Sequence, residues 1–441
     1  MSPSTFTPAQ NTAIRETGRS LLVSAAAGSG KTTVLAERCA RLLCEPVDGK
    51  PCEAADLLVV TFTDAAAAEM RERIHKALQA RLDDAPSALR RHIEEQLALL
   101  PAAPISTMHS FCNDLIRRWF TVAKIDPRAD ILDAEEAQLL QYETIEALFD
   151  ELYGSKTDEA HAFRRLVEED FNGSDTALVE RILEMHDFLR SLPEAPVWIE
   201  QVGNRLAVAD ADRLSKTVHA LRRCRLADEL AMQREWVGTV LAGWAPREVE
   251  RCAQLQQLAV YRDALDGWKA SLAESARPEA VDRVCAAIAA FGLSARQSGR
   301  RSGPKLDETL LARAKAAYEK VRTKLLRDRL QNRCARFTFA EYLDGQRRIA
   351  EKQRTLTQIV ARFAARYADA KRTDNVLDFS DLEHLAYRIL SDGGSPPGPS
   401  DVARRCHDRY RYVLVDEFQD INPIQEAILR LVSRETDDRR E

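Results

Sequence analysis

The stretch after residue 24 combines small residues with one lysine and two threonines, a composition suited to holding phosphate. An apolar run at residues 21–23 predicts a short strand, and apolar residues at helical spacing follow Thr32. A glycine-rich turn between a strand and a helix directs backbone N–H groups and a helix N-terminus at one point, which attracts a polyanion. The residues expected to contact a nucleotide are Ala25, Ala26, Ala27, Gly28, Ser29, Gly30, Lys31, Thr32 and Thr33.

Within this loop, Lys31 is placed to reach the β- and γ-phosphates of ATP, and the Thr32 hydroxyl to ligate Mg²⁺. Ala25 stands where such loops usually have their first glycine. The alternative is an alanine- and glycine-rich helix start that binds nothing. The strand, the glycines, the lysine and the threonine stand in register, which favours the phosphate loop.

A second candidate site follows the apolar run at residues 412–415, which predicts a parallel strand buried on both faces. Nucleotide hydrolysis needs a carboxylate near the metal and a base that activates water. We therefore assign Asp416 to Mg²⁺ and Glu417 to the water, with Gln419 as a relay of nucleotide state. An ordinary solvated acidic pair is the alternative. Because Lys31 and Asp416 lie near opposite ends of the chain, a large insertion must separate two halves of one core.

Two further apolar runs end in aromatic and hydroxyl side chains. The run at residues 57–63 precedes Asp64, which can cap the next helix, and the run at residues 105–107 repeats the design. Beside a phosphate loop, such strand ends favour a single-stranded nucleic-acid track along the rim of the sheet, although phenylalanines of the core are the alternative. The residues predicted to lie along the strand are Phe62, Thr63, Thr107, His109 and Phe111.

Six segments in this order resemble a known family: FTPAQNTAI, AAAGSGKT, VVTFTDAAAAEMRERI, ISTMHSF, LDFSDLEHL and VLVDEFQD. The resemblance is to the first motor domain of superfamily 1 DNA helicases of the UvrD/Rep type, closest to the RecB/AddA branch. It implies an α/β fold, a RecA-like P-loop NTPase whose parallel sheet has helices on both faces. It also implies ATP and Mg²⁺ as cofactors, recognition of adenine by Gln10, and 3′–5′ DNA unwinding in double-strand break repair and recombination. Asp64 departs from the asparagine usual at its position, which puts a charge near the DNA path.

The predicted architecture is a motor domain interrupted by a large all-helical insertion. Residues 1–120 are its first, ATP-binding half, residues 121–375 are the insertion, and residues 376–441 return with the acidic strand. In the helicase interpretation the insertion would guide duplex DNA. Within residues 301–336, eleven basic residues accompany four acidic ones, which fits either a solvated face or a contact with phosphates.

A second motor domain, which in this family adds arginines to the ATP site, is absent from the 441 residues. We therefore expect a fragment that by itself binds Mg-ATP and single-stranded DNA weakly and hydrolyses ATP slowly or not at all. The resemblance implies, as partner, a second subunit of a helicase–nuclease complex. A non-catalytic module that only docks DNA or a partner is the main alternative. A small-molecule kinase or a transport ATPase would give no reason for the Thr-Phe-Thr and Thr-x-His-Ser-Phe strand ends.

Composition sets limits on these interpretations. The net charge of -5 and pI of about 6.0 require any nucleic-acid contact to come from local patches. Nine cysteines without CxxC pairs favour reduced thiols over a zinc or iron–sulfur site. We see no secretory signal and no apolar run of the roughly 18 residues that a membrane span needs. The expected protein is cytoplasmic and has no membrane contact.

Overall fold

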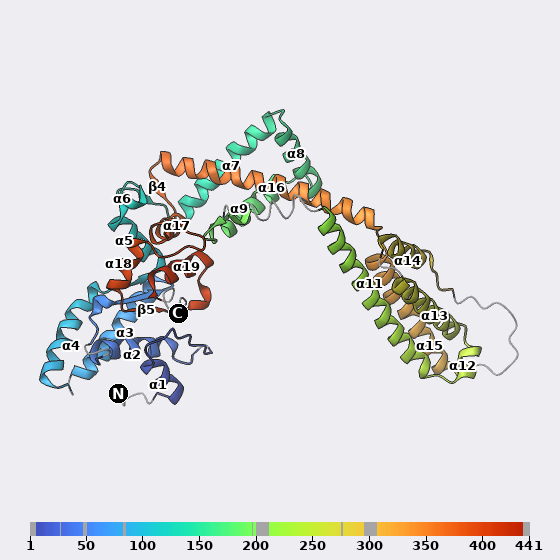
Figure 1. Ribbon diagram of the computed structural model, residues 1–441, viewed down its shortest axis with the longest axis horizontal. Coiled ribbons are helices and arrows are strands. Elements are labelled where there is room, and N and C mark those ends of the chain that lie inside the picture. Colours follow the sequence, from blue (N-terminus) through green and yellow to red (C-terminus); the bar gives the residue numbers. More distant parts are fainter. Residues whose placement is uncertain are drawn as a thin grey trace. The chain divides into compact units, whose positions relative to one another are not determined.

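The structure is a computed structural model, mostly helical with a small parallel sheet, and it divides into two compact units (Figure 1). Unit 1 comprises residues 1–199 and 356–441, and unit 2 comprises residues 200–355. The residues that the structure describes are 6–26, 28–46, 51–82, 85–195, 197–199, 211–274, 277–294 and 307–434. In these ranges no helix combines the length and the apolar character that crossing a membrane requires.

The sheet of unit 1 has three parallel strands in the order β2-β1-β5. Val59 of β1 lies opposite both Ile105 of β2 and Leu414 of β5, so the carboxyl ends of all three strands meet at one edge. All three strands were expected from their apolar runs and are confirmed. Their bounds are β1 (Leu57–Thr61), β2 (Ile105–Thr107) and β5 (Tyr412–Val415).

Side chains of β1 alternate between two hydrophobic clusters, as a strand period of two requires. Leu57 and Val59 pack on the side of α2, α3 and α4, whereas Leu58 and Val60 pack on the side of α5, α17, α18 and α19. The expectation of helices on both faces is confirmed. These helices are α2 (Lys31–Cys44), α3 (Asp64–Leu82), α4 (Ser87–Leu99), α5 (Met108–Arg118), α17 (Phe379–Leu390), α18 (Asp401–Arg409) and α19 (Pro423–Val432).

In the other described residues of unit 1 the regular structure is helical, apart from a two-stranded parallel pair of β3 (Asp130–Ile131) and β4 (Val376–Leu377). β3 lies where the chain leaves the three-stranded sheet, and β4 lies where it returns. Their pairing therefore holds these two places side by side. Between them, three helices and part of α16 share a separate core that includes Phe163 and Phe363. The bounds are α1 (Pro8–Arg15), α6 (Phe120–Ala123), α7 (Ala134–Gly154), α8 (Asp158–Asp170), α9 (Asp175–Arg190) and α16 (Phe339–Thr373).

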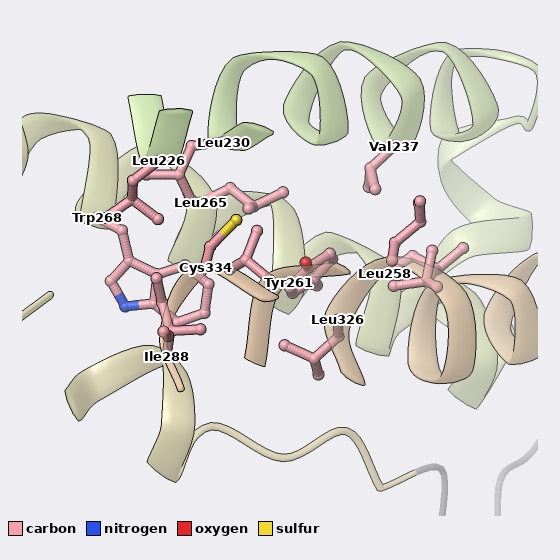
Figure 2. Packing of buried hydrophobic residues seen from close by; sticks show 14 of the residues in the cluster. Leu226, Leu230, Val237, Leu258, Tyr261, Leu265, Trp268, Ile288, Leu326 and Cys334 are labelled. Atoms are coloured by element: carbon pink, nitrogen blue, oxygen red, sulfur yellow. The ribbon is translucent and has the colours of Figure 1, made fainter. Parts of the chain in front are cut away.

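Unit 2 is helical throughout its described residues and has its own core (Figure 2). Leu230 from α11, Tyr261 and Leu265 from α13, and Leu326 from the π-helical segment η3 meet there. The buried Gln233 amide donates to Leu325 O at 2.9 Å and is thereby satisfied. The bounds are α11 (Ala211–Ala242), α12 (Pro246–Arg251), α13 (Ala253–Glu274), α14 (Pro278–Ala290), α15 (Glu308–Glu319) and η3 (Lys320–Cys334).

The compact units have other bounds than the three predicted segments. Residues 121–199 and 356–375, which the sequence assigned to the insertion, belong to unit 1 with the sheet. The division into motor and insertion by function therefore stays a prediction. What the structure does define is a purely helical unit 2 among the described residues between 211 and 355.

Two strand predictions are corrected. Residues 21–23 belong to no strand, and Leu22 is 75% exposed. An extended segment becomes a strand only when its backbone groups pair with a neighbour, and these residues form no ladder with the sheet. For the same reason β5 is an edge strand, and only Leu414 of its four residues is fully buried. Burial of residues 412–415 on both faces was a wrong expectation.

The cap of α3 is also corrected. Asp64 is the first residue inside the helix rather than its cap. The Thr63 hydroxyl accepts the Ala66 N–H at 3.1 Å, and Thr63 O accepts the Ala67 N–H at 3.0 Å. Thr63 therefore satisfies the first unpaired N–H groups of the helix, as N-cap threonines do.

A buried ionic cluster joins α16 to α17 inside unit 1. Lys371, whose side chain is 6% exposed, donates to Asp378 at 2.6 Å and also to Asp381, and Arg190 donates to Asp381 at 2.7 Å. Burial alone would raise the pKa of Asp378, but Lys371 and Arg190 hold that pKa below its usual value. Both carboxylates thus depend on these cations for their burial.

We expect Lys371→Ala to lower the free energy of unfolding by about 3–5 kcal/mol, because it leaves buried carboxylates without their main partner. Urea unfolding of the whole chain measures the change. Arg372→Ala is the matched control, since that side chain is 77% exposed and pairs with exposed Asp369. It should cost less than about 1 kcal/mol. Equal losses for both variants would contradict the assignment.

Candidate functional site

The loop before α2 has the backbone conformation of an anion cradle. Gly28 and Gly30 have φ of 77° and 83°, in the left-handed region that side chains with a Cβ rarely adopt. Gly30 is the N-cap of α2, and no side chain caps this helix. The first N–H groups of α2 are therefore available to a ligand. Ala27, one of the predicted contacts, lies outside the described residues.

Lys31 begins α2 and folds back over the loop, where its Nζ donates to Ala25 O at 3.0 Å. This bond holds the ammonium group above the loop, where a phosphate would replace the carbonyl as its partner. Thr33 faces elsewhere, because its hydroxyl accepts from Arg73 of α3 at 2.9 Å. The backbone of Thr33, but not its side chain, is thus free to face a ligand at the loop.

The two halves of the predicted site meet in the structure. Thr32 Oγ1 lies 3.4 Å from Asp416 Oδ2, although 384 positions separate the two residues. Asp416 stands at the carboxyl end of β5, where its backbone N–H donates to Val60 O at 2.9 Å. Burial and then the neighbouring Glu417 raise the pKa of Asp416, while Thr32 and Lys31 act in the opposite direction. Lys31 and Thr32 therefore lie close enough to Asp416 to influence its charge.

Glu417 has a φ of 53°, which is uncommon for a residue with a side chain. Such strain persists where the surroundings fix it and often marks functional sites. Its carboxylate accepts from the Gln419 amide. Gln419 also donates to Asp420 at 3.3 Å. Glu417 and the predicted relay Gln419 thus stand in direct contact.

The Gln10 amide lies against the loop, and its Nε2 donates to Ser29 O at 3.1 Å. Its Oε1 accepts the Thr7 N–H at 2.8 Å in the capping box of α1. Gln10 therefore positions α1 on the loop. Its role in recognising adenine stays a prediction.

The end of β1 presents its aromatic ring to solvent. Phe62 is 68% exposed. Thr63 beside it is exposed as well, and its hydroxyl is engaged as the cap of α3. The ring face is therefore available for stacking on a base.

The end of β2 differs from that of β1. Phe111 is 5% exposed and packs in the core with its ring edge toward Tyr410. Thr107 is nearly buried and caps α5 through the Ser110 N–H. The structure offers neither side chain to a nucleic acid, because α5 turns both toward the core. Only His109 is partly open, with its side chain 39% exposed.

Two residues of α17 join this region without having been predicted. The Phe379 ring is 42% exposed and lies 4.9 Å from the His109 ring, centroid to centroid. The Glu383 carboxylate is buried, with Oε1 at 3.1 Å from His109 Nε2. The segment LDFSDLEHL contains both residues, but its helical spacing alone does not distinguish them from ordinary helix residues.

A cavity of about 680 Å³ lies elsewhere in unit 1. None of the predicted site residues lines it. Its wall includes Lys124, Arg190, Lys371 and Arg388, and Arg190 and Lys371 already pair with Asp381. The cavity is thus separate from the phosphate loop.

The oxygen atoms at the loop fit a hard divalent cation. A threonine hydroxyl beside a carboxylate suits Mg²⁺, which keeps several waters and takes further ligands from phosphate groups. Within the described ranges no group of three or more histidine, cysteine or acidic side chains could hold a metal by itself. Thr32 and Asp416 would therefore hold Mg²⁺ together with a nucleotide.

Comparison with known proteins places this geometry in a family. The family described as UvrD/REP helicase N-terminal domain matches residues 6–438. The chain belongs to the UvrD/REP helicase family. The resemblance seen in the six sequence segments is thereby confirmed.

Curated relatives of the family cover nearly the whole chain. An ATP-dependent helicase/nuclease subunit from Moorella thermoacetica is 37% identical over 439 residues, which are 98% of this chain and 30% of the relative. The proteins of the same name from Desulforudis audaxviator and Geobacillus thermodenitrificans are 37% and 34% identical over 99% and 98% of this chain, and 34% of each relative is covered. The chain thus spans about a third of the length of these relatives.

We expect Asp416→Asn to raise the free energy of unfolding by roughly 0.5–2 kcal/mol near neutral pH, as removal of strained site charges often does. The raised pKa shows that the ionised carboxylate is disfavoured in the folded chain. The gain should therefore be complete above that raised pKa and decline as the pH falls toward the ordinary pKa of an aspartate, below which Asp416 is protonated in both the folded and the unfolded state. Urea unfolding at neutral and acidic pH measures this difference. Asp408→Asn, an exposed change on α18, should have little effect at either pH.

Proposed function

We propose that this chain is the part of a DNA helicase that binds ATP and single-stranded DNA. The observation that carries the proposal is the contact between Thr32 and Asp416, which joins the phosphate loop to the acidic strand end. A glycine turn without a ligand would not require a carboxylate from the far end of the chain beside it. A RecA-like motor fold, of which β2-β1-β5 would be part, is proposed with it.

In this proposal each side chain has one task. Backbone N–H groups at the start of α2 and the Lys31 ammonium bind the phosphates, and Thr32 and Asp416 hold Mg²⁺. Bound Mg²⁺ supplies charge neutralisation of the phosphate oxygens. Glu417 accepts a proton from the attacking water, and Gln419 holds the Glu417 carboxylate in position.

Single-stranded DNA would run along the carboxyl ends of β1 and β2. Phe62 provides an open ring, and His109 with Phe379 provides a second stacking surface. Sequence-tolerant binding of single strands commonly uses such rings. Thr63 and Thr107 would contribute through the helix ends that they cap, and Phe111 would support the track from the core.

We propose that the helical insertion contacts duplex DNA, but the basic residues of the insertion do not add support, because several of them pair with acidic side chains. In the described part of the basic segment, Arg322 pairs with Glu319, Arg327 with Asp328, and Arg329 with Glu229. Local acidic partners reduce the net field that phosphates would experience. Lys320 instead lies over the Trp236 ring at 4.6 Å.

Because the chain spans about a third of its relatives, the activities of a whole helicase are proposed for this chain only as contributions to a larger protein. Unwinding in the 3′–5′ direction, a second subunit of a helicase–nuclease complex and a role in double-strand break repair are proposed from the resemblance and from the names of the relatives. We propose that residues 1–441 alone hydrolyse ATP slowly or not at all. Robust strand separation by the purified chain would contradict this. None of the nine cysteines, all of them described, forms a disulfide, which suits the proposed cytoplasmic location.

We expect Lys31→Ala to weaken binding of a fluorescent ATP analogue with Mg²⁺ by roughly 10- to 100-fold, because a charge-assisted hydrogen bond to phosphate is lost. Lys76→Ala is the control, as its side chain is 70% exposed and pairs with Glu72 on the surface of α3. Equal affinity of wild type and Lys31→Ala would overturn the nucleotide site.

Any DNA-stimulated hydrolysis should disappear in both Lys31→Ala and Glu417→Gln. DNA binding that is indifferent to nucleotide would instead favour the non-catalytic module.

We expect Phe62→Ala to weaken binding of a labelled single-stranded oligonucleotide by about 1–3 kcal/mol, the usual contribution of one stacked base. Fluorescence anisotropy at low salt measures it. Phe188→Ala, another half-exposed ring of unit 1, is the control and should leave affinity unchanged. Phe111→Ala should instead lower stability by about 3–5 kcal/mol, as core phenylalanines do. Unchanged DNA affinity in Phe62→Ala would remove Phe62 from the track.

A further inference from the structure

Glu383 of α17 carries a buried carboxylate with three side-chain partners. The residue is 4% exposed. Its Oε1 lies 3.1 Å from His109 Nε2 and accepts the Gln425 amide at 2.5 Å, and its Oε2 accepts the Asn422 amide at 3.2 Å. Burial alone would raise the pKa of Glu383, but these hydrogen bonds hold it below its usual value. The group is therefore a carboxylate at neutral pH, and its charge depends on all three partners.

One partner belongs to the proposed DNA track. His109 follows the end of β2, is partly exposed, and lies against the exposed Phe379 ring, with the two ring planes tilted by 36°. A nucleic-acid base or phosphate that reaches this platform meets the same imidazole that faces Glu383.

The other two partners of Glu383, Asn422 and Gln425, lie where residues 416–422, the acidic segment, meet α19. Asn422 is the N-cap of α19, and Gln425 completes its capping box. Residues 416–422 connect the end of β5 to this cap, and they include Asp416, Glu417 and Gln419. The position of the cap thus fixes one end of the segment that carries the acidic pair.

We propose that Glu383 is a positioning residue that couples occupancy of the DNA track at His109 to the nucleotide site through Asn422 and Gln425. This inference rests on the proposed function. A single oxygen, Oε1, serves both His109 and Gln425, so a ligand that draws the imidazole away changes the bond to Gln425. The change reaches a segment that is held at one end by the β1 ladder and at the other by the cap.

The coupling is measured as a change in affinity, which must be reciprocal between the two ligands. The dissociation constant of a fluorescent, non-hydrolysable ATP analogue with Mg²⁺ is determined on residues 1–441, with and without a saturating single-stranded oligonucleotide. In wild type we expect the oligonucleotide to change this constant by about fivefold or more. The coupling ratio is the dissociation constant without the oligonucleotide divided by the constant with it. In Glu383→Gln this ratio should fall to about one, while each ligand alone binds within about threefold of wild type.

Two further variants separate coupling from a structural role. Gln425→Leu breaks the same chain of contacts at its other end and should also reduce the ratio to about one; it decides the matter if Glu383→Gln fails to fold. Glu426→Gln lies next to Gln425 but pairs with Arg430, and it should keep the wild-type ratio. A merely structural Glu383 would weaken both ligands or stability without changing the ratio.

The outcomes distinguish this inference from the proposed function. If wild type binds both ligands with a ratio near one, or if Glu383→Gln and Gln425→Leu keep the wild-type ratio, the coupling is refuted and the two sites stand. If wild type binds neither ligand, the proposed function fails and the coupling fails with it.

Discussion

The contact between the Thr32 hydroxyl and the Asp416 carboxylate is the constraint on which the rest of the site depends. It exists because β1 and β5 are parallel neighbours, so that Asp416 emerges at the same edge as the end of β1. α2 packs against one face of β1 and presents its N-terminus there. Hundreds of residues separate these elements along the chain, and the sheet holds them together because it pairs β1 with β5 directly.

The sheet that provides this edge is small, and its stability comes from being covered on both sides. β1 is buried along its whole length and divides its side chains between two cores. The helices of the second core, α5, α17 and α19, also carry His109, Glu383 and Gln425. The same packing that stabilises the sheet therefore brings the proposed DNA track and the end of the acidic segment to one carboxylate.

Acidic side chains have different surroundings in different parts of the chain. At the proposed nucleotide site, burial and the neighbouring Glu417 raise the pKa of Asp416. Between α16 and α17, Lys371 satisfies Asp378 and Asp381 within the protein. In the described part of unit 2, Arg322, Arg327 and Arg329 of η3 each pair with an acidic residue.

The sequence by itself determined the chemistry of the site. Gly28, Gly30, Lys31 and the acidic pair follow local rules of backbone freedom and side-chain type, and short continuous apolar runs predict β1, β2 and β5. Only the tertiary structure decided which side chains face outward. Phe62 is open whereas Phe111 is buried, because burial depends on the helices packed against each strand end rather than on the local pattern. Residues 21–23 form no strand, and Glu383 contacts both His109 and Gln425, for the same reason: pairing and contact are set by neighbours distant in sequence.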